Sequence, residues 1–132
     1  MQKAFATYVE QHQLVVQGSK VLAGVSGGVD SVAMAQLLHS QGLLGAIAHA
    51  HFGLRGVDAD ADAALVMALA ERLEVPFFIQ QFNTRSEADA AGESIQMAAR
   101  RLRFAWFEEL LDEHALGAVA VAAHLDLSLI HI

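Results

Sequence analysis

The sequence predicts an α/β fold, a doubly wound and mainly parallel sheet with helices on both faces. Three observations support this prediction. Short apolar runs typical of buried strands alternate with longer segments of helical periodicity, glycine and proline separate the two kinds, and a glycine-rich turn directly follows the first apolar run. Strands separated by helices favour parallel pairing, because each helix carries the chain back across the sheet.

The first half of the chain is expected to contain two helices and two strands. A partial apolar stripe predicts a helix over residues 2–11, and the run KVLAGV predicts a buried strand over 20–25. After the glycine-rich turn we expect a helix over 30–40, which Gly42 ends. The apolar segment 45–51 predicts the second strand.

The second half is expected to repeat this alternation. Leucine and alanine on one face predict a long helix over 58–74, and Pro76 separates it from a third strand that starts with FFI. A short helix or turn reaches Gly92. Ser94 is a typical N-cap and predicts a helix that extends to His114. The apolar segment 117–122 predicts the fourth strand.

Composition narrows the class of protein. The chain has 132 residues, a length that suits one domain spanning residues 1–132, and 8 basic against 15 acidic side chains give a net charge of −7. This acidic balance argues against holding nucleic acid by bulk electrostatics. The absence of cysteine excludes disulfide frameworks, zinc ribbons and thiol nucleophiles. No apolar stretch approaches the roughly 18 residues that span a bilayer, and the polar start predicts a cytoplasmic protein with no membrane partner.

The most informative motif is the turn between the first strand and the next helix, with the sequence SGGVDS. Gly27 and Gly28 allow backbone amides to approach a ligand, and the helix that follows offers unpaired N–H groups and a positive dipole end. The Ser26 and Ser31 hydroxyls can donate to phosphate oxygens, and Asp30 could hold Mg²⁺. The motif is neither a Walker A loop nor a dinucleotide GxGxxG. The alternative interpretation is a tight strand–helix turn in which serine or aspartate caps the helix.

Three segments resemble known families. SGGVDS resembles the SGGxDS signature of the PP-loop ATP pyrophosphatases. AHAHFGLRG, over residues 48–56, and GESIQMAARRLRF, over 92–104, resemble two segments of the tRNA(Ile)-lysidine synthetases. The three blocks occur in the order and spacing of that family, and the resemblance extends from Lys20 to Asp126. It implies a Rossmann-like domain of the adenine nucleotide alpha hydrolase type.

The resemblance also implies an activity. Members of this family use ATP, Mg²⁺ and free lysine to modify the wobble cytidine of tRNA(Ile), through an adenylated cytidine, with release of pyrophosphate and AMP. A non-catalytic ATP-binding fragment and another PP-loop adenylating enzyme are the alternatives. Sulfur-transferring members of the group normally need cysteine, so its absence disfavours them.

Basic residues outside the turn complete the expected site. Arg100 and Arg103 are three residues apart, so they share one helix face, and the resemblance assigns them with Asp30 to catalysis. A solvated basic patch is the alternative, and Arg101 is expected to face solvent. The resemblance places His49 and Arg55 at the end of the second strand as further contacts to the nucleotide.

The chain departs from the family pattern at two places. His51 stands where the family usually has asparagine, which puts the hydrogen-bond role of that position in question. A later family segment, HHxDDxxET, is matched only by His124 and Asp126, and Leu127 replaces its second aspartate. Asp126 is expected to bind metal together with Asp30. From about residue 127 the pattern is lost, which predicts a domain that is incomplete at its C-terminus and lacks most of the tRNA platform.

Two other metal sites are disfavoured by spacing. His49 and His51 share one strand face, but no third ligand has a helpful spacing. The aspartates at 58, 60 and 62 invite a calcium-loop interpretation, yet the glycine and the distal glutamate that such a loop needs are missing. These aspartates are expected to complement the N-terminus of the following helix instead.

Overall fold

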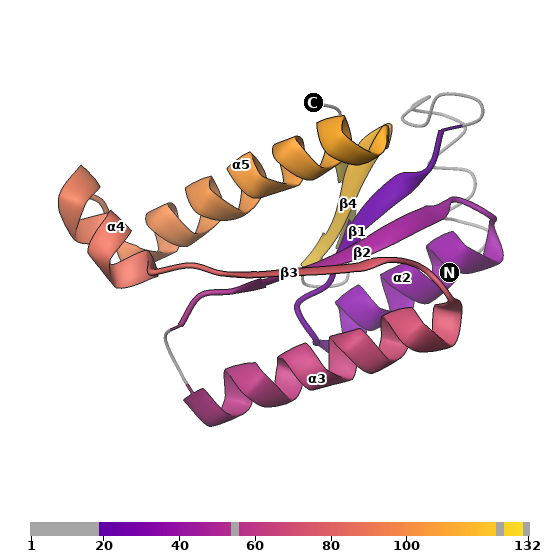
Figure 1. Ribbon diagram of the computed structural model, residues 1–132, viewed down its shortest axis with the longest axis horizontal. Coiled ribbons are helices and arrows are strands. Elements are labelled where there is room, and N and C mark those ends of the chain that lie inside the picture. The colour runs from indigo at the N-terminus through magenta and orange to yellow at the C-terminus, as the bar shows by residue number, and fades with distance from the viewer. Residues whose placement is uncertain (1–18, 54–55, 124–125, 131–132) are drawn as a thin grey trace.

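The computed structural model describes residues 19–53, 56–123 and 126–130, which form one sheet covered by helices (Figure 1). The expected helix over 2–11 lies outside these residues. Each of the other expected elements is present, with ends that agree to about two residues. In chain order they are β1 (Val21–Gly24), α2 (Val29–Ser40), β2 (Leu44–His51), α3 (Gly56–Leu73), β3 (Phe77–Gln81), α4 (Thr84–Ala91), α5 (Ile95–His114), β4 (Ala118–Ala123) and β5 (Asp126–Ile130).

The sheet has the strand order β3-β2-β1-β4-β5. The first four strands are parallel, and β5 pairs antiparallel with β4. The chain therefore builds outward from β1 to β3 and then returns to place β4 on the other side of β1. This order confirms the prediction of a doubly wound, mainly parallel sheet. The edge strand β5 was not predicted, because the segment before it lacks the glycine or asparagine typical of a hairpin turn.

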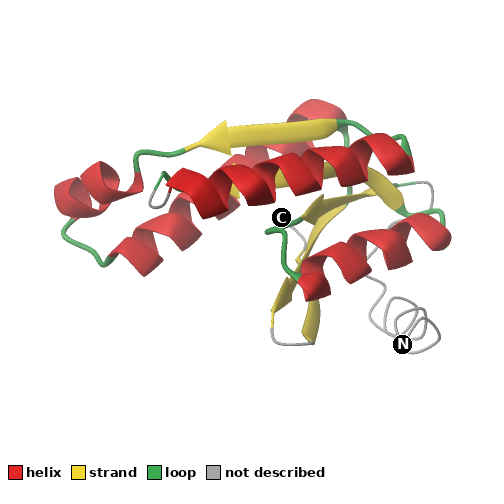
Figure 2. Ribbon diagram, turned by 90° about the horizontal axis from the view of Figure 1, so that it is seen from below, coloured by secondary structure: helices red, strands yellow, loops and turns green. Residues whose placement is uncertain are grey.

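Helices cover both faces of the sheet (Figure 2). Successive residues of a strand point to opposite faces, so β1 serves two cores. Val21 and Ala23 pack with side chains of α2 and α3, whereas Leu22 packs with Trp106 and Phe107 of α5. All three of these β1 side chains are fully buried. The central strand is thus fixed from both sides, and the turn that follows it starts from a rigid base.

One end of the molecule extends beyond the sheet. Figure 1 shows α4 and the beginning of α5 projecting past the carboxyl ends of the parallel strands. The chain reverses between the two helices at Gly92, whose φ is +67°, and the Ser94 hydroxyl then accepts a 3.1 Å hydrogen bond from the Met97 N–H. This cap confirms the predicted start of α5. The early turns of α5 therefore overhang the edge of the sheet where β1 ends.

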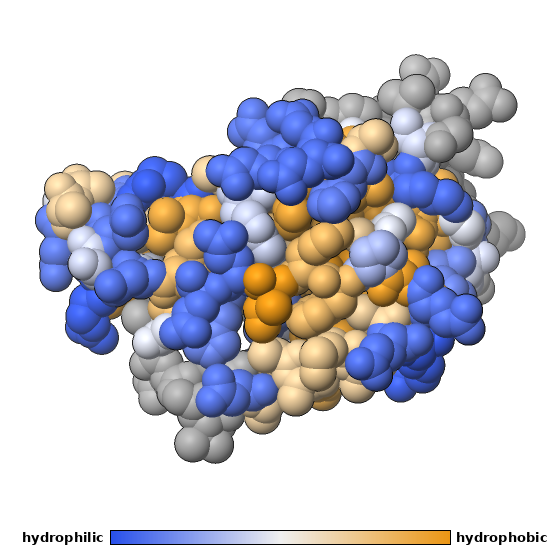
Figure 3. Space-filling view, viewed as in Figure 1, coloured by the Kyte–Doolittle hydropathy of each residue, from blue (hydrophilic) through white to orange (hydrophobic). Residues whose placement is uncertain are grey.

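Apolar side chains are also visible on the surface. In the space-filling view they gather over the middle of the molecule, between polar ends (Figure 3). The large exposed apolar side chains include Leu65 and Met67 on α3 and Ile79 on the edge strand β3. Among the residues that the structure describes, no helix is both long enough and apolar enough to cross a membrane.

Candidate functional site

The turn between β1 and α2 is closed by its two serines. Ser31 is buried, and its hydroxyl donates to the Gly28 carbonyl across 2.9 Å. Because that bond uses the only hydroxyl proton of Ser31, the Ser26 hydroxyl is the donor in the 3.2 Å contact between the two side chains. The turn therefore has an internal hydrogen-bond network that fixes its shape.

The amides of the two glycines are held loosely by the same serines. The Gly27 N–H donates to Ser31 Oγ at 3.3 Å, and the Gly28 N–H donates to Ser26 Oγ at 3.4 Å. Both distances exceed the range of about 2.7–3.2 Å typical of N–H···O bonds. Gly27 has a φ of +107°, which a residue with a side chain rarely adopts. Oxygens of an anion could replace the serines on these amides at little cost.

The same turn begins a helix. Gly28 is the N-cap of α2 and makes no side-chain capping bond. The positive end of the helix dipole therefore faces the turn. Together with the loosely held glycine amides, this end of α2 is suited to bind a phosphate-bearing anion.

His49 lies on β2 and forms a hydrogen bond with the residue that precedes the turn. Its Nδ1 is 2.8 Å from the carbonyl oxygen of Val25, and His49 is only 4% exposed. A carbonyl can only accept, so Nδ1 carries the proton. The Val25 N–H donates in turn to the Ala48 carbonyl at 2.9 Å. His49 thus fixes the residue that precedes the turn, and direct contact between His49 and a nucleotide stays a prediction.

β1 and α5 come very close where Gly24 ends the strand. A Cβ at Gly24 would lie 2.8 Å and 2.9 Å from two ring atoms of Phe107. Phe107 is 1% exposed, and its ring packs against those of Trp106 and Phe104 at centroid distances of 5.7 Å. Glycine at position 24 therefore lets α5 approach the sheet closely enough to overhang the turn.

A small pocket lies beside the turn, at the carboxyl ends of β1, β2 and β4. Gly24 and Ser26 line one side of it, and Arg103 and Phe107 of α5 line another. The order of the strands reverses between β1 and β4. Doubly wound sheets bind their ligands at the carboxyl ends of the strands, where this reversal occurs. The turn and Arg103 thus meet at the expected place for a ligand.

Arg103 is a cation without a full set of partners. Its Nε is buried and has no hydrogen-bond partner among the residues that the structure describes. Burial lowers the pKa of the Arg103 guanidinium, and the nearby charge of Arg100 lowers it further. The folded protein therefore disfavours this charge, and an anion in the pocket would compensate for that cost.

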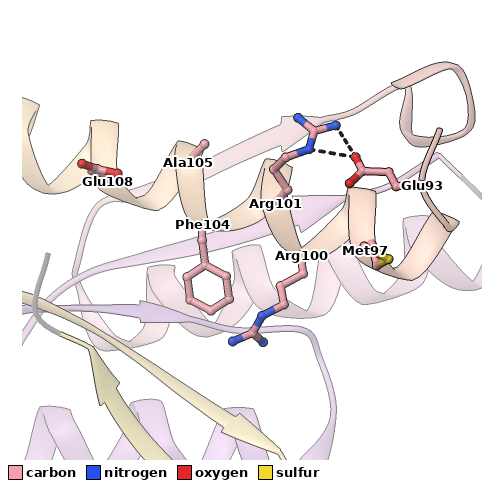
Figure 4. A pocket seen from close by; sticks show the side chains of 7 residues that line it. All are labelled: Glu93, Met97, Arg100, Arg101, Phe104, Ala105 and Glu108. Carbon is pink, nitrogen blue, oxygen red and sulfur yellow. Dashed lines mark hydrogen bonds and ion pairs between the residues drawn. The ribbon is translucent and has the colours of Figure 1, made fainter. Parts of the chain in front are cut away.

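Arg100 and Arg103 lie on the same face of α5, as predicted. Their guanidinium carbons are 4.8 Å and 4.9 Å from the centroid of the Phe104 ring. Figure 4 shows Arg100 and Phe104 pointing from α5 toward the strands, whereas Arg101 points toward Glu93. Arg101 donates to Glu93 Oε1 through Nε at 2.8 Å, and this hydrogen bond raises the pKa of Arg101. Arg101 is exposed, which confirms its predicted orientation.

The same figure shows a broader groove along α5. Side chains of both charges line it together with apolar ones, namely Glu93, Met97, Arg100, Arg101, Phe104, Ala105 and Glu108 (Figure 4). Arg100 and Phe104 border this groove, while Arg103 lines the small pocket beside the turn.

His51 has a definite hydrogen-bond role despite its departure from the family pattern. Its Nδ1 accepts from the Gly53 N–H at 3.1 Å, which leaves the proton on Nε2. That Nε2 donates to Asp60 Oδ1 at 3.1 Å. The buried Thr84 hydroxyl donates to the Phe52 carbonyl at 2.9 Å. The segment that leaves β2 is therefore held by both α3 and the start of α4.

Carboxylates approach the turn from two elements. Asp30 lies in the first turn of α2, as predicted. Asp62 of α3 lies against the turn, since a Cβ at Gly27 would be 3.0 Å from Asp62 Oδ1. The described residues include no group of three or more histidine and acidic side chains able to hold a metal ion. A magnesium ion there would depend on one or two carboxylates plus oxygens of the substrate.

The structure thus brings together most of the predicted site. Ser26 of the turn and Arg103 line one pocket, His49 bonds to the residue before the turn, and Arg100 lies beside Arg103. Arg55 and the side chain of Asp126 lie outside the described residues, so their roles stay predictions. Sequence reasoning missed Gly24 and the contact of Asp62 with the turn. A glycine at the end of a buried strand was the one available signal for the first of these.

Comparisons with known proteins agree with this geometry. The family model described as a PP-loop domain matches residues 1–128. The tRNA(Ile)-lysidine synthase of Parabacteroides distasonis is 44% identical over 119 residues, which are 90% of this chain and 27% of that protein. The protein of the same name from Porphyromonas gingivalis is 43% identical over 121 residues, 91% of this chain and 27% of that protein. The chain thus spans about a quarter of the length of these relatives.

Solved structures share the fold at low sequence identity. An NH3-dependent NAD synthetase from Campylobacter jejuni aligns with a TM-score of 0.64 and 17% identity, over 89% of this chain and 53% of that one. An NMN synthetase from Francisella tularensis aligns with a TM-score of 0.65, also at 17% identity, over 90% of this chain and 53% of that one. These likenesses confirm the doubly wound, Rossmann-like fold.

Proposed function

The chain belongs to the PP-loop domain family, and on that premise we propose that it is the ATP-binding part of a tRNA(Ile)-lysidine synthetase. The observation that carries the proposal is that Ser26 of the turn and Arg103 of α5 line one pocket. Loosely held glycine amides follow Ser26 at the start of α2, and Arg103 has a buried Nε that lacks a partner among the described residues. Both would be satisfied by the phosphates of ATP.

The proposed reaction has two steps. An oxygen of the wobble cytidine attacks the α-phosphorus of ATP, and the bond to the bridging oxygen breaks, so that pyrophosphate leaves. The amine of free lysine then attacks the activated base carbon, and AMP leaves with the transferred oxygen. The Gly27 and Gly28 amides would bind the leaving pyrophosphate, while Arg103 and Arg100 would stabilise the charge that develops at the α-phosphorus.

Supporting groups keep these donors in place. His49 would hold Val25 and hence the turn, and the Ser26 and Ser31 hydroxyls would turn from the glycine amides to phosphate oxygens. We assign Mg²⁺ to Asp30, with Asp126 as its predicted second carboxylate. The ion would neutralise charge on the phosphates, and one carboxylate with several phosphate oxygens fits its coordination habits. Arg55 is proposed as a further contact to the nucleotide.

Two experiments test the proposal. The chain should bind ATP in isothermal titration calorimetry, and EDTA should weaken that binding. A chimera should then carry residues 19–123 in place of the matching segment of the Parabacteroides relative. With tRNA(Ile), lysine and ATP, it should release pyrophosphate and form lysidine that is detectable by mass spectrometry of the tRNA.

The matched control is the same chimera with Gly28→Val, which should fold but release no pyrophosphate. ATP binding by a folded chimera that forms no lysidine would contradict the assignment to lysidine synthesis and favour another PP-loop activity. Failure of the unmodified chain to bind ATP would contradict the whole proposal.

A further inference from the structure

We propose that Phe104 is a positioning residue for phosphate binding, because its ring holds the guanidinium groups of Arg100 and Arg103 together above the turn. The inference rests on the proposed function, and it adds a residue that touches no reacting atom. The two guanidinium carbons are 4.8 Å and 4.9 Å from the centroid of the same ring. One aromatic side chain thus organises both predicted catalytic arginines.

Two neighbouring cations need such a support. Arg100 and Arg103 are three residues apart on α5, and their like charges repel each other. Burial is the main cause of the lowered pKa of Arg103, and the charge of Arg100 lowers it further. The negative face of an aromatic ring attracts a cation within about 6 Å, and more strongly where water is partly excluded. An aromatic ring within reach of both arginines therefore offsets part of their repulsion before any anion arrives.

The ring itself is held in place. Phe104 is half-buried and contacts Phe107 edge to face, with centroids 5.7 Å apart and an interplanar angle of 85°. Phe107 is buried against Gly24 at the end of β1. A chain of contacts therefore links the backbone just before the turn to the ring and, through it, to both arginines. This link sets where the arginines lie relative to the glycine amides.

The alternatives to this role are weaker. If the Phe104 ring served only to fill the core, nothing would require two arginines to lie over it. Arg101 on the same helix pairs with the Glu93 carboxylate instead, so α5 does not place every arginine on an aromatic ring. A ring that stacked on the adenine base would contribute to adenosine and ATP binding alike. The positioning role affects only ligands that carry phosphate.

The test compares ATP with adenosine. Phe104→Leu keeps apolar volume and removes the aromatic face, and it should weaken ATP binding about tenfold while changing adenosine binding by less than about twofold. Phe104→Tyr should restore ATP affinity, since it keeps the ring. Equilibrium dialysis measures both ligands, and urea unfolding shows whether each variant is folded. Phe104→Met is a second flexible replacement if the leucine variant is unstable.

A matched control is available on β3, against the far end of α5. Phe78 is also half-buried, and its ring stacks on His114 at the far end of α5, with centroids 4.4 Å apart. Phe78→Leu should leave ATP affinity unchanged. Unchanged ATP affinity in Phe104→Leu, or equal losses for ATP and adenosine, would overturn the positioning role. If the unmodified chain binds no ATP, the proposed function fails and this inference fails with it.

Discussion

The turn after β1 and the arginine face of α5 meet at one pocket but are stabilised in opposite ways. In the turn, Ser31 and Ser26 satisfy polar groups locally, within a few residues of chain. On α5, Arg103 Nε has no partner among the described residues, and burial lowers the pKa of its guanidinium. The turn thus belongs to the stable fold, whereas Arg103 is held at a cost that the Phe104 ring offsets in part and an anionic ligand would offset further.

The largest expected effect on ATP binding comes from a change in the turn that leaves the fold intact. A Cβ at Gly28 would meet only Ser26 Oγ, at 3.7 Å, so the protein has room for a side chain there. Gly28→Val should weaken ATP binding roughly a hundredfold, because it blocks charge-assisted hydrogen bonds worth about 1.5–3 kcal/mol each. Calorimetric titration measures the loss. Undiminished ATP affinity in a folded variant would refute the placement of the site.

Replacing Arg103 should change binding and stability in opposite directions. Arg103→Met should weaken ATP binding by about 1.5–3 kcal/mol, since it removes a charged donor. The same change should raise the free energy of unfolding by up to about 1 kcal/mol, because a desolvated charge is replaced by an apolar chain. Titration and urea unfolding measure the two quantities. A variant that loses stability as well as affinity would contradict the contrast between the two regions.

The contact between Gly24 and Phe107 joins the two regions, so a change there should lower both stability and ATP affinity. Gly24→Ala places a methyl group against Phe107, and overpacking of this kind costs about 1–3 kcal/mol of stability. ATP affinity should fall as well, because α5 must move away from the turn. Gly28→Ala is the matched control for stability, and it should unfold at nearly the urea concentration of the unmodified chain. Equal unfolding midpoints for the two variants would contradict the close contact between Gly24 and Phe107.

The smallest effect is expected at Arg101. Its partner Glu93 lies just before α5, Arg101 itself is exposed, and ion pairs at the protein surface contribute about 0–1 kcal/mol. Arg101→Gln should therefore leave both ATP affinity and stability nearly unchanged, which titration and urea unfolding can verify. If Arg101→Gln lost as much ATP affinity as Arg103→Met, the three arginines at 100, 101 and 103 would act together, and the distinction between the two faces of α5 would be wrong.

Local patterns predicted the elements and the turn, whereas contacts between distant segments were not predictable. Alternating periodicity located the four parallel strands, and SGGVDS located the anion-binding turn. The spacing of Arg100 and Arg103 placed them on one face, but it could not reveal that both guanidinium groups lie over the Phe104 ring or that Arg103 Nε is buried.

Longer-range partners were equally hidden. The bond of His51 to Asp60 joins the end of β2 to α3, and nothing in the eight intervening positions predicts it. The approach of Asp62 to Gly27 depends on how α3 packs beside the turn. Such contacts follow from the tertiary arrangement, which a one-dimensional pattern does not contain. The strand β5 belongs to the same class, because its pairing with β4 is set by the sheet.

The most direct test of the central claim is a crystal structure of the chain with a non-hydrolysable ATP analogue and Mg²⁺. The account predicts phosphate oxygens within about 3 Å of the Gly27 and Gly28 amides and of Arg103 Nε, with the Ser26 and Ser31 hydroxyls turned toward the ligand. An analogue bound with its phosphates away from the turn, or with Arg103 Nε still without a partner, would contradict it.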